Sequence, residues 1–491
     1  MKRTVWWIAL LVVLVHGIWI QRVAVHARAG GADPYTMCDT ESYVLAADQF
    51  FSSIPVAPVF RERMFYPLLL AVARQIGSDT TVLWLLLPLH GLSILAIAYI
   101  AGILSDKRWV PIGSALLYAL NPSFYTYGVN LGTDVCHAQF AIVATAASMA
   151  WMKTGRRRWV IAAVLFWGVA QMTRQAFLPI AVALVPLWWG RLREPGTRLA
   201  TVAALGATLA IPVFYVVSNA MVFGVPAPSF ATVEALHRYV VPRMRMVQRH
   251  AENPGLELTP LWLDERERVA LENEDYRALQ LYRPSAASPD FRTHYLRVME
   301  SDMEIIRKDW GLFWTSGMQE VWSQASTPPS APARVLGQAD GPGIARQESL
   351  FRKGFKLSMA LCLIGLAAAA ARRHYGIVLF VWLFLAMTLL PSVLVWWLGG
   401  RMRLPAELVL MPFVVLALGS SGGWIFIAGT ALLGYAPFKL FGLPELYLQV
   451  ATASFLLVGL GAALRDRGNT GGWLRAVARG CTRRPGTGTV S

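Results

Sequence analysis

Long apolar runs recur along most of the sequence, and they restrict the fold more than any other feature. The run TVLWLLLPLHGLSILAIAYIAGIL at 81–104 contains no charged residue. A helix of about 20 apolar residues crosses the ~30 Å hydrocarbon core of a bilayer. Overall, 55% of the residues are hydrophobic and only 15% are charged. The sequence therefore predicts an all-α polytopic membrane protein rather than a chain of soluble domains.

The hydropathy pattern predicts a bundle of about 12 transmembrane helices. The first, MKRTVWWIALLVVLVHGIWI, also resembles a signal peptide followed by ARAG. We predict an uncleaved span, because its apolar stretch is at the long limit for a signal peptide. The other predicted spans are 82–104, 109–124, 131–152, 158–173, 175–190, 198–222, 354–371, 376–397, 404–421, 423–438 and 446–464.

Basic clusters predict how these spans are oriented. The formal net charge is +16, and the clusters MKR, SDKR, KTGRRR, GRLREPGTR and ARRHYG, together with the basic C-terminal tail, all fall on one side of the predicted membrane. By the positive-inside rule that side is the cytoplasm. We expect a multi-pass protein of the cell membrane (inner or plasma membrane), with both termini cytoplasmic. This placement accounts for the basic residues without a nucleic-acid partner.

The spans and loops divide the chain into four parts. We predict an N-terminal transmembrane module (1–222) with a first outer loop (21–81), an extracytoplasmic loop domain (223–353), C-terminal transmembrane helices (354–464) and a basic cytoplasmic tail (465–491). The loop domain holds 17 of the 29 acidic residues. The sequence has no GxxxxGK[ST] phosphate loop, so it offers no support for a nucleotide-driven mechanism.

Several acidic side chains converge on the predicted outer face. Asp39 and Glu41 lie in MCDTESYVLAADQFF, Asp134 lies near the outer end of span 131–152, and Glu407 lies near the outer end of span 404–421. One structural alternative makes the first stretch a short interfacial helix, with Asp39 as its N-cap and Glu41 as a first-turn acid. The apolar side of this helix would consist of Tyr43, Ala46, Ala47, Phe50 and Phe51. We favour a site, because the topology brings these acids to the same face.

Arginines gather on the same face, against the cytoplasmic bias of basic residues. They are Arg61, Arg63, Arg174, Arg401 and Arg403. A guanidinium group binds phosphate through two parallel hydrogen bonds, which makes this set suitable for a lipid-linked phosphate. Alternatively, each arginine extends toward lipid headgroups from the end of a span.

Together these motifs resemble the GT-C superfamily of polytopic glycosyltransferases, such as protein O-mannosyltransferases and the lipid A aminoarabinose transferase. The similar stretches are CDTESYVLAADQF, RERMFYPLLLAVA, NLGTDVCHAQFAI, AQMTRQAFLPI, SNAMVFG and GGRMRLPAELVLMP. They cover about the first 225 residues and the 398–421 region. The resemblance implies a GT-C-like helical bundle that transfers a hexosyl or pentosyl group, on the extracytoplasmic face, from a polyprenyl-phosphate donor to a glycan, lipid or protein acceptor.

For this reaction we expect single-displacement, inverting chemistry with an acidic general base. Asp39 is the first candidate for the base and Glu41 the second. The five arginines would bind the donor phosphate, and Arg174, Arg401 and Arg403 would also stabilise the departing phosphate. Asp134 would orient the acceptor or, with Glu41 and His137, bind Mg²⁺ or Mn²⁺. A histidine simply packed at a span end is the alternative for His137.

Other residues leave further alternatives open. Cys38 and Cys136 both lie near the outer face, where they could form a disulfide. His90, deep in a predicted span, is expected to bond a neighbouring helix. Trp310, Trp314 and Trp322 are available to stack on sugars, or they pack the loop domain or lie at the membrane interface. A polytopic carrier or a flippase for lipid-linked sugars is the alternative function, and an O-antigen-type polymerase or ligase is a third.

Overall fold

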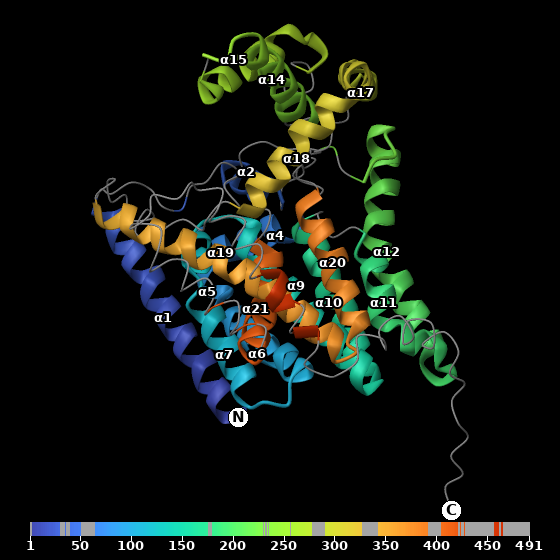
Figure 1. Ribbon diagram of the computed structural model, residues 1–491. Coiled ribbons are helices and arrows are strands. Elements are labelled where there is room, and N and C mark those ends of the chain that lie inside the picture. Colours follow the sequence, from blue (N-terminus) through green and yellow to red (C-terminus); the bar gives the residue numbers. More distant parts are fainter. Residues whose placement is uncertain are drawn as a thin grey trace, which may run out of the picture.

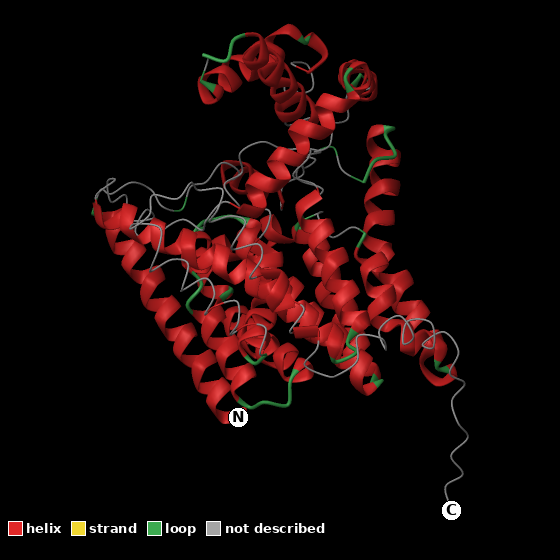
Figure 2. Cartoon of the chain, in the orientation of Figure 1, coloured by secondary structure: helices red, strands yellow, loops and turns green. Residues whose placement is uncertain are grey.

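All regular secondary structure in the described part of the computed structural model is helical, with no strand there (Figure 2). That part comprises residues 2–29, 35, 40–50, 64–174, 179–228, 230, 233, 235–255, 257–276, 290–326, 342–390, 404–420, 423, 427, 456–460 and 463–464. The predicted all-α class is thus confirmed for these residues. The predicted spans 423–438 and 446–464 lie largely outside them.

A bundle of apolar helices forms the body of the molecule (Figure 1). Its N-terminal helices are α1 (Lys2–Arg28), α2 (Thr40–Phe50), α4 (Phe65–Ile76), α5 (Thr81–Leu85), α6 (Leu87–Leu104), α7 (Trp109–Ala119), α8 (Pro122–Tyr127), α9 (Thr133–Thr154), α10 (Arg157–Thr173), α11 (Ile180–Arg193) and α12 (Pro195–Phe223). Its C-terminal helices are α19 (Pro342–Ala371), α20 (Tyr375–Leu389) and α21 (Leu404–Leu418). Helix α19 begins upstream of the span predicted to start at residue 354.

Among the described residues, five helices are long and apolar enough to cross a membrane. They are Arg3–Arg28, Thr81–Leu104, Thr133–Thr154, Pro195–Phe223 and Lys353–Ala371. In α9, 89% of the apolar stretch is buried, against 22% in α12. Helix α9 therefore lies at the centre of the bundle, whereas α12 lies at its edge with most of its apolar surface uncovered.

The predicted span 109–124 is two helices in the structure, α7 and α8. The Asn121 side chain caps α8 by accepting a hydrogen bond from the Ser123 amide at 2.8 Å, and Pro122 occupies the first helical position. Proline lacks an N–H group and disfavours helical geometry in the residue before it. The Asn-Pro pair therefore ends one helix and begins the next, a signal that hydropathy alone does not register.

Side-chain contacts with backbone carbonyls identify one end of the bundle. At one end, Lys107 donates a hydrogen bond to the Gly419 carbonyl at 2.9 Å, and Arg191 donates to the Met152 carbonyl at 3.0 Å. This basic end joins the turns that the charge pattern places in the cytoplasm. Helices α2 and α4 lie at the opposite end, which we call the outer end, and the loop domain extends beyond it (Figure 1).

The loop domain is also helical. It contains the π-helical turn η2 (Leu236–Val240) and the helices α14 (Val241–Glu252), α15 (Leu258–Glu272), α17 (Phe291–Lys308) and α18 (Trp310–Ser326). Leu236, Val240 and Met244 pack with Ile306 and Phe313, so the first and last helices of the domain share one small core. Helix α18 also contacts α20 of the bundle.

One glycine allows two helices of the bundle to approach at backbone distance. A Cβ atom added to Gly365 of α19 would overlap the backbone carbonyl of Phe413 in α21. Small residues allow membrane helices to approach at backbone distance, where dispersion contacts are strongest. Helices α19 and α21 are thereby fixed together and support α9, which α21 also contacts.

Candidate active site

The first outer loop is attached to the beginning of α9 by hydrogen bonds. The Thr40 hydroxyl donates to the Leu131 carbonyl at 3.2 Å, and the Leu131 amide donates to the Tyr35 carbonyl at 3.0 Å. The Tyr43 hydroxyl bonds the Thr133 hydroxyl at 3.2 Å. Helix α2 therefore begins beside the first turn of α9, although 90 residues of sequence separate Tyr43 from Thr133.

An apolar cluster packs next to these hydrogen bonds, between α1, α2, α4 and α9. It combines Ile20 and Val23 of α1, Tyr43 of α2, Leu70 of α4 and Cys136 of α9. The first loop contains the short helix α2, and its Tyr43, Ala46 and Ala47 are buried. Because α2 packs on protein through this side, its position at the outer end is fixed by the bundle itself.

Asp134 and Arg174 form an ion pair at the outer end. Asp134 lies in the first turn of α9, and Arg174 is the residue that ends α10. The Arg174 guanidinium donates to the Asp134 carboxylate, and their side chains are 14% and 4% exposed. A carboxylate at a helix N-terminus is stabilised by the helix dipole. Two predicted site residues are thus in direct contact, and most of their surface is removed from water.

Tyr66, in the first turn of α4, lies in the same region. Its ring is edge-on to the ring of Tyr43, with centroids 5.5 Å apart. Burial raises the pKa of Tyr66 well above its ordinary value, and the neighbouring Cys136, Tyr43 and Asp134 raise it further. We refer to Tyr43, Tyr66, Thr133, Asp134 and Arg174 as the Asp134–Arg174 centre.

Most of the other predicted site residues lie outside the described part of the chain. Glu41 belongs to the first turn of α2 by its backbone, while its side chain is not described. Several predicted residues lie outside the described part of the chain: Cys38, Asp39, Arg61, Arg63, Arg401 and Arg403. Glu407 lies in α21, but its side chain is not described. Their roles as base and phosphate ligands therefore stay predictions.

His137 lies one helical turn after Asp134. It is buried, and its Nδ1 atom lies 3.2 Å from the Ala170 carbonyl, where it packs α9 against α10. Within the described residues, no group of three or more His, Cys, Asp or Glu is arranged to bind a metal ion. The Asp134 carboxylate is held by Arg174, so a cation there would compete with the guanidinium group. Cys136 is a free, buried cysteine.

A second polar cluster lies inside the bundle. His90 of α6 bonds Gln139 of α9, which confirms the expectation that His90 bonds a neighbouring helix. The rings of His16 and His90 are edge to face, with centroids 4.3 Å apart. This cluster links α1, α6 and α9 below the outer end.

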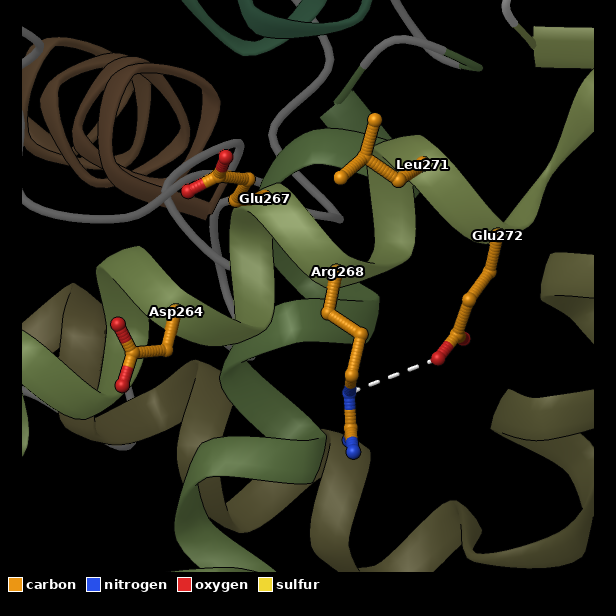
Figure 3. A pocket seen from close by; sticks show the side chains of 5 residues that line it. All are labelled: Asp264, Glu267, Arg268, Leu271 and Glu272. Carbon is orange, nitrogen blue, oxygen red and sulfur yellow. Dashed lines mark ion pairs between the residues drawn. The ribbon is translucent and has the colours of Figure 1, made fainter.

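The shallow depression on the surface of α15 is separate from the Asp134–Arg174 centre. Its volume is about 430 Å³, and it is lined by Asp264, Glu267, Arg268, Leu271 and Glu272 (Figure 3). Arg268 pairs with Glu272 at 3.6 Å across it. Its carboxylates lie along one exposed helix, an arrangement typical of a solvated helix face.

Two of the three tryptophans that are available to stack on sugars or to pack the loop domain contact each other on α18. Trp310 and Trp314 are 52% and 42% exposed, and their ring centroids are 5.7 Å apart in an edge-to-face arrangement. The side chain of Trp322 lies outside the described residues. This exposure is compatible both with stacking on a sugar and with a place at the membrane interface.

Sequence reasoning missed the hydroxyl groups at the Asp134–Arg174 centre. It assigned Tyr43 to an apolar helix face and gave no role to Tyr66 or Thr133. The sequence carried one signal for Tyr66, namely its place directly before Pro67 in the FYPLLL stretch. For Thr133 the signal was its place directly before Asp134 in the first turn of α9.

No family model matches the sequence, and no curated protein matches it. A crystal structure of the Archaeoglobus fulgidus oligosaccharyltransferase, tethered to an acceptor peptide containing the NVT sequon by a disulfide bond, is similar to this chain with a TM-score of 0.40 and 13% sequence identity. The likeness covers 97% of this chain and 57% of that chain, so this chain spans little more than half of its length. The TM-score and the sequence identity are both too low for this likeness to define a family for the chain.

Proposed function

We propose that the chain is a GT-C-type membrane glycosyltransferase that uses a polyprenyl-phosphate sugar donor at the outer end of the bundle. The observation that carries this proposal is the contact between Asp134 and Arg174 beside the beginning of α2. Residues from the first loop, α9 and α10 meet there, as the motif resemblance implies.

Arg174 would bind the donor phosphate, with Asp134 holding its guanidinium in place. A planar guanidinium group has five N–H donors, so it can contact a carboxylate and phosphate oxygens at the same time. When the bond to the sugar breaks, negative charge develops on the phosphate. A cation held in advance at a partly buried position stabilises that charge without reorganising. Asp134 is therefore proposed as a positioning residue for Arg174.

The acceptor hydroxyl needs a general base. Asp39 is the first candidate, and it precedes Thr40, whose hydroxyl bonds the Leu131 carbonyl beside the first turn of α9. Glu41, in the first turn of α2, is the second. Either carboxylate would take the proton as the hydroxyl oxygen attacks the anomeric carbon and the polyprenyl phosphate leaves. Because the phosphate is a good leaving group, no protein acid is required.

The test supplies labelled polyprenyl-phosphate sugars to membranes that contain the wild type or a variant. Removing the base should lower transfer by about 10²–10⁴-fold, and we expect this of Asp39→Asn. Asp134→Asn should lower transfer by at least about tenfold, since Arg174 loses its partner. Asp106→Asn, in the exposed turn between α6 and α7 at the basic end, is the matched control and should transfer like the wild type.

The carrier alternative has one observation in its favour, the polar cluster of His90 and Gln139 within the bundle. Polar groups at membrane depth are typical of transport pathways. Measurable substrate uptake, with no transfer from any donor, would favour the carrier and exclude the transferase. Transfer that is unchanged in both Asp39→Asn and Asp134→Asn would remove the Asp134–Arg174 centre from the reaction.

A further inference from the structure

The hydroxyl group of Tyr66 is buried and has no hydrogen-bond partner in the described part of the chain. The residue is 0% exposed. More than nine in ten buried polar groups in folded proteins are paired, because an unpaired one loses its water without compensation. Substituting phenylalanine would remove this cost and keep the ring, so packing alone does not explain the hydroxyl.

The polar groups around Tyr66 already have partners. Tyr43, whose ring contacts Tyr66, uses its hydroxyl on Thr133 at 3.2 Å. Asp134 is held by Arg174. The Tyr66 hydroxyl thus lies at a centre whose other members are paired with one another, and its own donor is left for a group that arrives from outside.

The electrostatic setting keeps Tyr66 protonated. Burial, together with nearby Cys136, Tyr43 and Asp134, raises its pKa well above the usual value for tyrosine. The group is therefore an O–H donor at physiological pH and is unsuited to act as a base. Tyr66 lies close enough to Asp134 to be affected by its charge, and Asp134 in turn contacts Arg174. A donor in this setting suits a ligand atom that only accepts hydrogen bonds, and phosphate oxygens are such atoms.

We propose that Tyr66 is a substrate-binding residue whose hydroxyl donates a hydrogen bond to a phosphate oxygen of the polyprenyl-phosphate donor bound at Arg174. This inference rests on the proposed function and adds a second phosphate ligand to it. Since Tyr66 is fully covered in the structure, the side chains that pack over it must move before the donor can reach its hydroxyl.

The test compares Tyr66→Phe with the wild type, both purified as full chains in detergent, using decaprenyl phosphate as the probe. Without the probe, the melting temperature of Tyr66→Phe should equal or exceed that of the wild type, because the variant lacks the unpaired hydroxyl. With the probe, its affinity should be weaker by about tenfold or more, the effect of losing a hydrogen bond to a charged group. In transfer assays, KM for the donor should rise more than kcat falls.

Tyr118→Phe is the matched control. Tyr118 is also fully buried, but its hydroxyl bonds Ser93 at 2.8 Å within the bundle. This variant should lose stability and bind decaprenyl phosphate as the wild type does.

Equal probe affinity in Tyr66→Phe and the wild type would overturn the inference, as would a wild type that does not bind decaprenyl phosphate. The two proposals fail separately. If binding depends on Tyr66 but no donor sugar is transferred, glycosyl transfer is wrong and the Tyr66 site stands. If transfer occurs and Tyr66→Phe binds normally, only the Tyr66 site is wrong.

Discussion

Among the described residues, buried charged groups lie in the loop domain and at the Asp134–Arg174 centre, and the two regions differ in which parts of the chain these groups join. In the loop domain, the Glu265 carboxylate is fully buried and pairs with Arg249 and with Arg268 of the same helix, each at 2.5 Å. His237 Nδ1 lies 3.0 Å from Asp302, and its Nε2 lies 3.2 Å from the Val269 carbonyl. These groups join neighbouring helices of one small domain.

The Asp134–Arg174 centre combines a buried ion pair with a buried hydroxyl that lacks a partner. Its members come from the first loop, α4, α9 and α10, which lie far apart in sequence. The difference teaches that a buried charge alone does not identify a site. An unpaired buried atom alone does not identify one either, because the second carboxylate oxygen of Asp302 in the loop domain also lacks a hydrogen-bond partner. The Asp134–Arg174 centre differs because distant segments of the chain bring an ion pair and an unpaired hydroxyl together there.

The largest effect on stability should come from the loop domain. Arg243 is fully buried, and its burial lowers its pKa to about 10, while the nearby Glu320 opposes the shift. Arg243→Met would leave Glu320 buried without that cation, which should cost about 3–5 kcal/mol. Thermal unfolding in detergent measures the loss, and donor turnover per folded molecule should not change.

The double variant Arg243→Met/Glu320→Gln tests whether the buried Glu320 charge causes the loss of stability, since it also removes that charge. It should recover much of the lost stability. A strong loss of turnover in folded Arg243→Met would contradict the distinction between the two regions.

At the Asp134–Arg174 centre we expect a smaller change in free energy than in the loop domain, but one that acts on the reaction itself. Arg174→Ala should lower transfer by about 10²–10³-fold, or about 2.7–4 kcal/mol in the barrier, as for other preorganised charge-stabilising groups. Arg174→Lys should be intermediate, because an ammonium keeps the charge without the planar fork. Arg158→Ala is the matched control, because Arg158 lies at the opposite end of the same helix, over the ring of Trp159. If Arg174→Ala and Arg158→Ala transfer sugar at the same rate in kinetic assays, the role of Arg174 is ruled out.

The smallest effect is a pH dependence of the loop domain. Burial raises the pKa of Asp302, although His237 partly offsets it. Between the ordinary aspartate pKa near 4 and the raised value, the native state holds a proton that the unfolded state has lost. The contribution of Asp302 to stability therefore decreases as pH rises through this range, by at most about 1.4 kcal/mol per pH unit. Melting curves of Asp302→Asn should lack this slope, and identical slopes in the variant and the wild type would exclude it.

Apolar periodicity and charge placement were enough to predict much of the bundle. Helix α10, predicted as 158–173, is Arg157–Thr173 in the structure, and the short helix after Asp39 is α2. These features depend on local pattern and on the membrane, both of which a sequence displays. The topology also placed Asp134 and Arg174 at the same end, and the structure brings them into contact.

What the sequence did not reveal depends on contacts between distant segments. The division at Asn121–Pro122 required attention to a side-chain cap rather than to hydropathy. The pairing of His237 with Asp302 joins residues 65 positions apart on helices without a distinctive motif. Whether the Tyr66 hydroxyl has a partner depends on the placement of α2, α4 and α9 together, and no local pattern contains that information.

The pairing of Asp134 with Arg174 also bears on how the protein is made. Helices α9 and α10 are consecutive and form a hairpin, so both charged residues emerge from the ribosome close together in time. An isolated charge is expensive to place in lipid, whereas a pair is far less so. We expect the hairpin to enter the bilayer with its two charges already joined, before α19, α20 and α21 have been synthesised.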